Sequence, residues 1–129
     1  MRSPTEIKII IESVGETTAE ITKERNPRTA EAVINALPIE GRANRWGDEI
    51  YFSIPVRADE ENSQVVTDLG DIAYWPPGNA LCIFFGPTPV SRGDEPRAYS
   101  PVNVIGKVKG DLSLLRRVRG GERVKITMG

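Results

Sequence analysis

Residues 26–46 read NPRTAEAVINALPIEGRANRW, and the first half of this segment has the pattern of a short amphipathic helix. Its apolar residues recur three and four positions apart, which places them on one helix face: Ala30, Val33, Ile34 and Leu37. Asn26 is a favoured N-cap residue, Pro27 suits the first helical position, and Pro38 ends the helix. The sequence therefore predicts a helix over residues 26–37 with one buried face.

Most of the remaining chain favours short strands separated by turns rich in glycine and proline. Strands are expected at residues 6–12, 17–23, 39–46, 50–54, 71–75, 80–85, 102–108 and 122–128. A second short helix, capped by Asp111, is predicted from Leu112, Leu115 and Val118. Residues 58–63 and 90–101 are expected to form surface loops, and Val65, Val66 and Leu69 an isolated apolar group. The first helix should therefore cover part of a β-structure.

Length and composition are those of one ordinary globular domain, which we expect to span residues 1–129, with 39% hydrophobic and 27% charged residues. The net charge of −1 provides no global basic field, so we expect neither nucleic acid nor a membrane as a partner. The longest apolar run, residues 80–85, is far shorter than a membrane span. The N-terminus has no signal-peptide layout, which favours a cytoplasmic protein.

Histidine is absent and there is one cysteine. The absence of histidine excludes Ser-His-Asp and Cys-His nucleophile arrangements and every His-ligated metal site. We therefore expect neither a metal nor a cofactor, and acid–base chemistry would fall to Asp, Glu, Lys, Tyr or the cysteine. Cys82 lies between Leu81 and Ile83, which predicts a buried, inert thiol.

Several other residues have two interpretations. Trp46 and Trp75 each follow a strand and precede a turn. We favour the interpretation in which they seal the mouth of a barrel; the alternative is that they stack on a ligand. Asp48 and Glu49 are adjacent and should face opposite sides, which favours a turn over a shared acid–base site. A group of arginines lies near the C-terminus: Arg116, Arg117, Arg119 and Arg123. We favour the interpretation in which they form a solvated helix face; the alternative is an RNA or phosphate site.

Three motifs in order along the chain resemble those of cyclophilins. Residues 27–33, PRTAEAV, resemble their Pro-x-Thr-Ala-x-x-hydrophobic helix, Ile83-Phe84-Phe85 resembles their core strand, and residues 104–108, VIGKV, resemble their Val-Phe-Gly-Lys-Val segment. Residues 37–52 and the FFGPTP segment at 84–89 resemble more closely a set of small, mostly uncharacterised prokaryotic cyclophilin-like proteins. The resemblance implies a mainly β fold, a closed eight-stranded barrel with two short helices covering its ends. It does not imply an activity.

The sequence departs from true cyclophilins where their proline isomerase activity resides. They carry Phe-His-Arg on the strand after the first helix, and that arginine serves the reaction; here Tyr51-Phe52-Ser53 stands in its place. The Met-x-Gln-Gly-Gly segment that follows in cyclophilins is replaced by the acidic loop 58–63. The groove tryptophan and histidine of their later loop have no counterpart here. The resemblance therefore implies a kept scaffold with an altered groove.

These observations predict a binding module with a groove for a peptide or small molecule and without isomerase activity. The candidate ligand-binding residues are Ser53, Arg57, Phe84, Phe85, Thr88 and Arg92. The segment at residues 86–89 is stiffened by two prolines and leads into the loop that ends at Pro101. It has two interpretations: it presents Thr88 and Arg92 to a ligand, or it only redirects the chain. Two alternatives stay open: an active peptidyl-prolyl isomerase with an altered site, and a structural or oligomeric interaction protein without a pocket. The sequence names no ligand, catalytic residue or oligomeric state.

Overall fold

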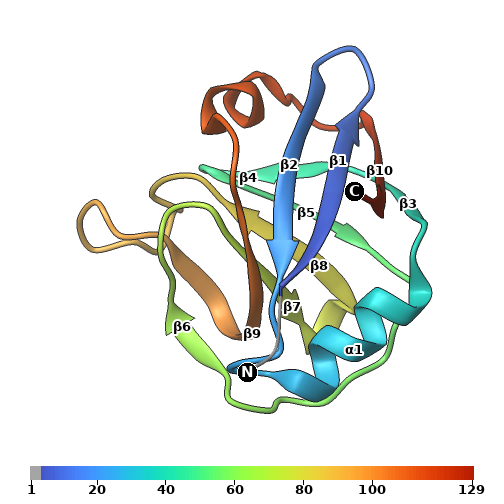
Figure 1. The fold of residues 1–129 in the computed structure, drawn as a ribbon. Coiled ribbons are helices and arrows are strands. Elements are labelled where there is room, and N and C mark those ends of the chain that lie inside the picture. Colours follow the sequence, from blue (N-terminus) through green and yellow to red (C-terminus); the bar gives the residue numbers. More distant parts are fainter. Residues whose placement is uncertain (1–3) are drawn as a thin grey trace.

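The computed structural model describes residues 4–129, which form a curled sheet with one helix beside it (Figure 1). The strands are β1 (Thr5–Ile11), β2 (Gly15–Ile21), β3 (Ile39–Arg42), β4 (Asn44–Trp46), β5 (Glu49–Ser53), β6 (Gln64–Val66), β7 (Asp71–Trp75), β8 (Ala80–Phe84), β9 (Arg97–Val108) and β10 (Arg123–Met128). The α-helix is α1 (Pro27–Ala36), and the two 3-10 helices are η1 (Pro76–Gly78) and η2 (Leu112–Arg117). The prediction of a mainly β fold is confirmed.

The strands pair in the order β3-β10-β1-β2-β9-β7-β8-β5-β4, and β6 pairs with β9 beside this path. The two end strands, β3 and β4, are separated in the chain by Ala43 alone. Ala43 donates its N–H to the Glu122 carbonyl and accepts from the N–H of Gly121. The predicted strand at residues 39–46 therefore leaves β10 at Ala43 and continues as the partner of β5. The sheet curls until its ends meet at this residue.

The predicted closed, eight-stranded barrel is not confirmed. Residues 4–129 form ten strands, and the hydrogen-bonded path runs from β3 to β4 without a pairing that joins these two. The strand count differs because one expected strand is divided at Ala43 and because β6 was expected to lie outside any strand. The helix prediction also changes, since η2 is a 3-10 helix; Asp111 caps it as predicted by accepting from the Ser113 N–H.

Alternation along the strands places apolar side chains inside the curled sheet. Ile7, Ile9 and Ile11 of β1 are fully buried, and β10 adds Val124 and Ile126 opposite them. From α1, Ala30 and Val33 are buried in the same core, while Ile34 and Leu37 are partly buried against it. The amphipathic pattern therefore identified the buried face of the helix correctly.

The first turn of α1 is capped from a distant segment. The Glu61 carboxylate accepts hydrogen bonds from the backbone N–H groups of Arg28 and Thr29, each at 3.2 Å. Asn26 occupies the N-cap position as predicted, but its side chain makes no capping bond. It is buried and donates to the Val104 carbonyl at 2.8 Å instead. Asn26 therefore fastens the helix to β9, and the acidic loop supplies the cap.

Residues 97–101 belong to β9 and not to the long loop that the sequence analysis predicts over residues 90–101. β9 pairs with β2 and β7 in its second half and with the short β6 at Arg97 and Val102. The side chains of residues 97–101 are mainly polar and do not show the pattern of a strand. The strand forms because the backbone groups of these residues pair with another strand. In Figure 1, β6 and the start of β9 lie side by side, apart from the main sheet.

A second, smaller apolar cluster lies on the face of the sheet opposite the main core. It consists of Ala73, Cys82, Phe84, Ala98, Val102 and Val104, with Tyr51 and Trp75 packed against it. On β8, Cys82 and Phe84 alternate with Leu81 and Ile83, which point into the main core. The start of β9 contributes to this cluster and so gives the outer face of the sheet an apolar floor. Within residues 4–129, no helix is long and apolar enough to cross a membrane.

Candidate functional site

A hollow of about 240 Å³ opens over the second apolar cluster, on the outer face of the sheet. It is lined by Trp46, Glu49, Tyr51, Trp75, Cys82, Ala98, Tyr99 and Val102. These residues come from β4, β5, β7, β8 and β9, so only the folded sheet brings them together. Among the lining residues that the structure describes there is no lysine or arginine. We call this hollow the aromatic pocket.

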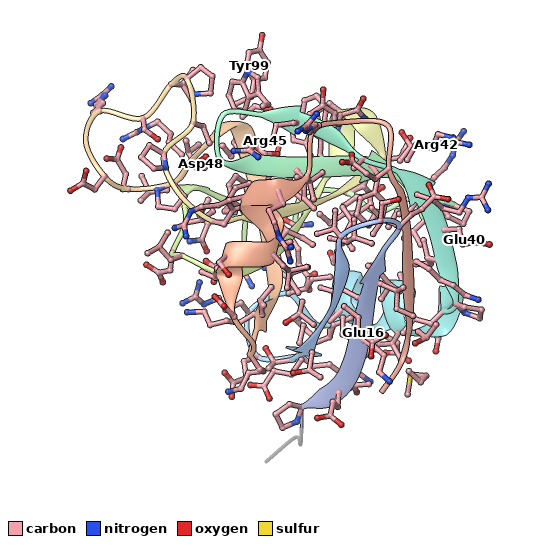
Figure 2. All side chains as sticks on the ribbon, turned by 90° about the horizontal axis from the view of Figure 1, so that it is seen from above. Glu16, Glu40, Arg42, Arg45, Asp48 and Tyr99 are labelled. Atoms are coloured by element: carbon pink, nitrogen blue, oxygen red, sulfur yellow. The ribbon has the colours of Figure 1, made fainter. Side chains whose placement is uncertain are left out.

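Three rings form one wall of the aromatic pocket. The Tyr99 ring lies 6.1 Å from the Trp46 ring and 6.3 Å from the Trp75 ring, centroid to centroid, and both pairs are edge-to-face. The indole N–H of Trp75 donates to the Ser100 hydroxyl at 2.7 Å, which fixes that ring. Tyr99 is 73% exposed and projects from the surface in Figure 2. Trp46 and Trp75 thus border an open hollow and do not seal the mouth of a barrel.

Glu49 is the acidic residue of the aromatic pocket. It begins β5 and is only 6% exposed. Burial raises the pKa of its carboxyl group to about 7, and a hydrogen bond with the Cys82 thiol partly offsets this rise. None of the ion pairs found within residues 4–129 includes Glu49. Carboxyl groups with such a perturbed pKa in a hollow are frequent at functional sites.

The Cys82 thiol lies beside Glu49 and is buried. Burial raises the pKa of this thiol well above its usual range, and the negative charge of Glu49 adds to the effect. A thiol with a raised pKa stays protonated and is a poor nucleophile. The predicted burial of the thiol is confirmed, and its raised pKa supports the prediction that it is inert. Cys82 is thus a neutral neighbour of Glu49.

The hairpin of β4 and β5 also carries Arg45, whose guanidinium group makes several hydrogen bonds. The Arg45 guanidinium bonds to the Asp48 carboxylate at 2.9 Å and donates to the carbonyls of Gly47, Arg116 and Val118 at 2.6, 2.8 and 2.9 Å. It also lies 4.9 Å from the Phe85 ring centroid. Figure 2 shows Arg45 and Asp48 close together. Asp48 and Glu49 therefore face different partners, as predicted, and do not share one site.

None of the six ligand-binding residues predicted from the sequence lines the aromatic pocket. Phe84 is buried in the second apolar cluster beneath it, whereas Phe85 belongs to the main core on the opposite face. Ser53 is exposed and shares the outer face of β5 with Tyr51, two residues away. Arg57 borders a separate hollow beside α1. The six residues are thus not gathered at one place.

The other two predicted residues, Thr88 and Arg92, lie in the segment between β8 and β9. The Thr88 side chain is buried, and its hydroxyl donates to the Arg97 carbonyl at 2.5 Å. The Arg92 side chain is exposed, and its backbone N–H donates to the Glu95 carboxylate at 2.9 Å. These internal bonds favour the interpretation in which the segment redirects the chain and Thr88 holds its shape.

No sequence motif groups the residues of the aromatic pocket, although one local pattern points to two of them. Glu49 and Tyr51 alternate with the apolar residues Ile50 and Phe52, which places an acid and an aromatic ring on one strand face. The position of β8 and β9 beside that face is a result of strand pairing. Within residues 4–129, no group of three or more His, Cys, Asp or Glu side chains is arranged to hold a metal ion.

Comparisons with known proteins agree with the motifs. A family model described as cyclophilin-like matches residues 5–127. The solution structure of the hypothetical protein AF2241 from Archaeoglobus fulgidus is similar, with 44% sequence identity, a TM-score of 0.83, and coverage of 98% of this chain and 95% of that chain. A search of curated proteins finds no match. The similar proteins support the fold and carry no activity with them.

Proposed function

We propose that this chain, which belongs to the cyclophilin-like family, is a binding module whose ligand enters the aromatic pocket. The observation that supports this proposal is the combination of exposed aromatic rings with a buried carboxyl group that has no ion-pair partner within residues 4–129. Pockets for drug-sized ligands usually have volumes of about 300 to 1,000 Å³. A hollow of about 240 Å³ therefore suits a small molecule or one side chain of a peptide.

A peptide ligand would extend beyond the aromatic pocket. Along β5 the outer face continues from Glu49 and Tyr51 to the exposed Ser53. We propose that Ser53 contacts the part of such a ligand that leaves the pocket. The other predicted contacts, Arg57, Phe84, Phe85, Thr88 and Arg92, stay predictions, and the buried Phe84 is the one that supports the pocket from below.

The proposed module lacks proline isomerase activity. That reaction needs a donor near the prolyl nitrogen, and the lining of the aromatic pocket contains no arginine among the described residues. The alternative is an active isomerase with an altered site, in which another group supplies the donor. A cis/trans exchange assay on proline peptides decides between them. We expect no acceleration over the uncatalysed rate.

Trp46 and Trp75 are the only two tryptophans of the chain, and both line the aromatic pocket. Their fluorescence and indole N–H signals in NMR therefore report directly on this site. We expect members of a collection of small fragments and short peptides to shift both indole signals, because a bound group contacts both rings. Tyr99→Ala should weaken this binding, whereas Leu69→Ala, which changes an exposed side chain outside the pocket, should not. Indole signals that no compound shifts at millimolar concentration would contradict the proposal.

The third alternative is an oligomeric interaction protein without a pocket. Light scattering combined with the same NMR experiment tests it. We expect the indole signals to respond to ligands at a protein concentration where scattering gives the mass of one chain. An oligomer in which Tyr99 is shielded and no fragment reaches the two indoles would favour the alternative.

A further inference from the structure

Four aromatic side chains and one carboxyl group are the main features of the aromatic pocket. Trp46, Tyr51, Trp75 and Tyr99 supply the rings, and Glu49 supplies the acid. The Tyr99 ring centroid lies 6.1 Å from that of Trp46 and 6.3 Å from that of Trp75. A group seated against these rings would lie within the distance of about 6 Å at which a cation is attracted to an aromatic face.

We infer that the ligand group of the aromatic pocket is a methylated ammonium cation, held by the aromatic rings and by the Glu49 carboxylate. This inference rests on the proposed binding function and adds the chemical class of the ligand. A methylated ammonium group has a positive charge and an apolar surface, and it carries few or no N–H donors that need hydrogen-bond acceptors. It therefore matches a site with much aromatic surface and few acceptors.

The charges around the pocket favour a cation over an anion. No lysine or arginine is among its described lining residues, so an anionic ligand would find no partner and would be repelled by ionised Glu49. Arg45, which lies nearby in the chain, is already engaged by Asp48 and by three backbone carbonyls. Ligand specificity would therefore come from the single acidic group of the pocket.

The charges also favour a cation over an uncharged group. An apolar ligand needs no acid, and a buried carboxyl group costs stability whenever it is ionised without a partner. Within residues 4–129 the fold offers Glu49 a thiol and no cation. A bound cation would supply the missing partner. The unfavourable burial of this acid is then explained by its ligand.

Binding of a cation should depend on pH because Glu49 must be ionised to attract it. The other titratable groups that line the pocket are the Cys82 thiol from β8, which contacts Glu49, the Tyr51 phenol from β5 and the Tyr99 phenol from β9. From β4 and β7 the neighbours are Trp46 and Trp75, which do not titrate, and the adjacent Asp48 is held by Arg45. The raised pKa of Cys82 keeps the thiol neutral. We therefore expect affinity to increase as pH rises through the Glu49 pKa of about 7.

The test compares choline with its neutral analogue in which carbon replaces the quaternary nitrogen. The two probes have nearly the same shape and differ in charge, and tryptophan fluorescence and the two indole N–H signals report their binding. We expect choline to bind about tenfold more tightly than the analogue, the size of one cation–π contact in a partly dry site. A short peptide with trimethyllysine forms a third arm. Tighter binding of the peptide than of choline would identify a protein ligand, and the reverse a free amine.

Glu49→Gln removes the charge and keeps the side-chain size. We expect it to weaken choline binding, to leave the binding of the neutral analogue unchanged and to abolish the pH dependence, because only the cation–π contacts with the rings then remain. The matched control is Glu40→Gln, which changes an exposed acid on β3 that lies well away from Tyr99 in Figure 2. The pH series on the unchanged chain gives the same comparison without a substitution, because protonation also neutralises Glu49.

The outcomes separate this inference from the proposed function. Equal binding of choline and its analogue, or choline affinity unchanged by Glu49→Gln, would overturn the cation and leave the binding module in place. Failure of choline, the analogue and the peptide to shift either indole signal would also overturn the cation. The binding module would then depend on the screen of uncharged fragments and unmodified peptides described above.

Discussion

Arg45 and Glu49 lie four residues apart in one hairpin, and the fold treats their charges in opposite ways. Arg45 has a carboxylate, three carbonyls and an aromatic ring as partners. Glu49 is almost fully buried, bonds to the Cys82 thiol, and has no ion-pair partner within residues 4–129. The first charge links β4 to the end of η2 and so holds the structure together. The second destabilises the structure when ionised, and acids with such a raised pKa are frequent at functional sites.

The largest effect should follow from removal of the partnered charge. We expect Arg45→Met to lower the free energy of unfolding by about 3 to 4 kcal/mol, because Asp48 and the carbonyls of η2 lose their donor. Urea unfolding monitored by circular dichroism measures this change. The control is Arg42→Met, since Arg42 is exposed and donates only to the Gly121 carbonyl at 3.0 Å among the bonds described. Equal losses in both variants would contradict the role of Arg45.

Removal of the Glu49 charge should have the opposite effect and increase stability. Folding raises the pKa of Glu49 from 4.5 to about 7, so the folded state binds more protons in this pH range and stability falls as pH rises through it. We expect Glu49→Gln to be the more stable protein above this range, by about 3 kcal/mol, and to match the unchanged chain below it. Urea unfolding across pH measures the difference. A stability difference between Glu49→Gln and the unchanged chain that does not vary with pH would contradict the raised pKa of Glu49.

A smaller effect is expected at a carboxylate that does have partners. Glu61 caps α1, and the hydrogen bonds from Arg28 and Thr29 outweigh its slight burial and lower its pKa. Its contribution is therefore present at neutral pH and is lost as pH falls through this lowered pKa, opposite in sign to that of Glu49. We expect Glu61→Ala to cost about 1 kcal/mol at neutral pH, as for other helix caps.

The control for this prediction is Glu60→Ala. The Glu60 carboxylate accepts from the Ser63 hydroxyl at 2.7 Å and has no bond to the helix among those described. Thermal unfolding of both variants should show the larger decrease for Glu61→Ala. An equal decrease for Glu60→Ala would show that the loss of stability comes from a general disturbance of the loop and not from loss of the helix cap.

The smallest effect on stability is expected at Tyr99, although it belongs to the proposed site. Because the residue is 73% exposed, Tyr99→Ala should change the free energy of unfolding by less than about 1 kcal/mol. Tryptophan emission should move to longer wavelength, since the Trp46 and Trp75 rings lose the neighbour that shields them. A large loss of stability would mean that Tyr99 supports the fold and is not a free wall of the pocket.

The sequence predicted the local elements well because short-range patterns determine them. The spacing of Ala30 and Val33 identified the buried face of α1, and the apolar setting of Cys82 identified a buried thiol. The motifs at residues 27–33 and 104–108 identified the family that the comparison over residues 5–127 supports. Each of these inferences depends on residues close together in the chain.

The predictions that failed depend on pairing over long distances. The start of β9 is polar and was expected to be a loop, yet the backbone of β6 makes it a strand. Asn26 has the residue type of an N-cap, but Glu61 caps the first turn of α1 instead. Glu61 lies 35 positions later in the chain, and the acidic loop brings it to the helix. Phe84 and Phe85 are both predicted to contact a ligand, whereas alternation along the chain places them on opposite faces.

The amino-acid sequence by itself determined the helix, most of the strands and the family, since periodicity and turn residues act over a few positions. Only the tertiary structure decided that Trp46, Glu49, Trp75 and Tyr99 meet, because these residues lie on four strands that strand pairing brings together on one face. It also decided that Arg45 has an ion-pair partner and that Glu49 has none within residues 4–129. A residue's charge is written in the sequence, but its burial and its partners depend on segments far away in the chain.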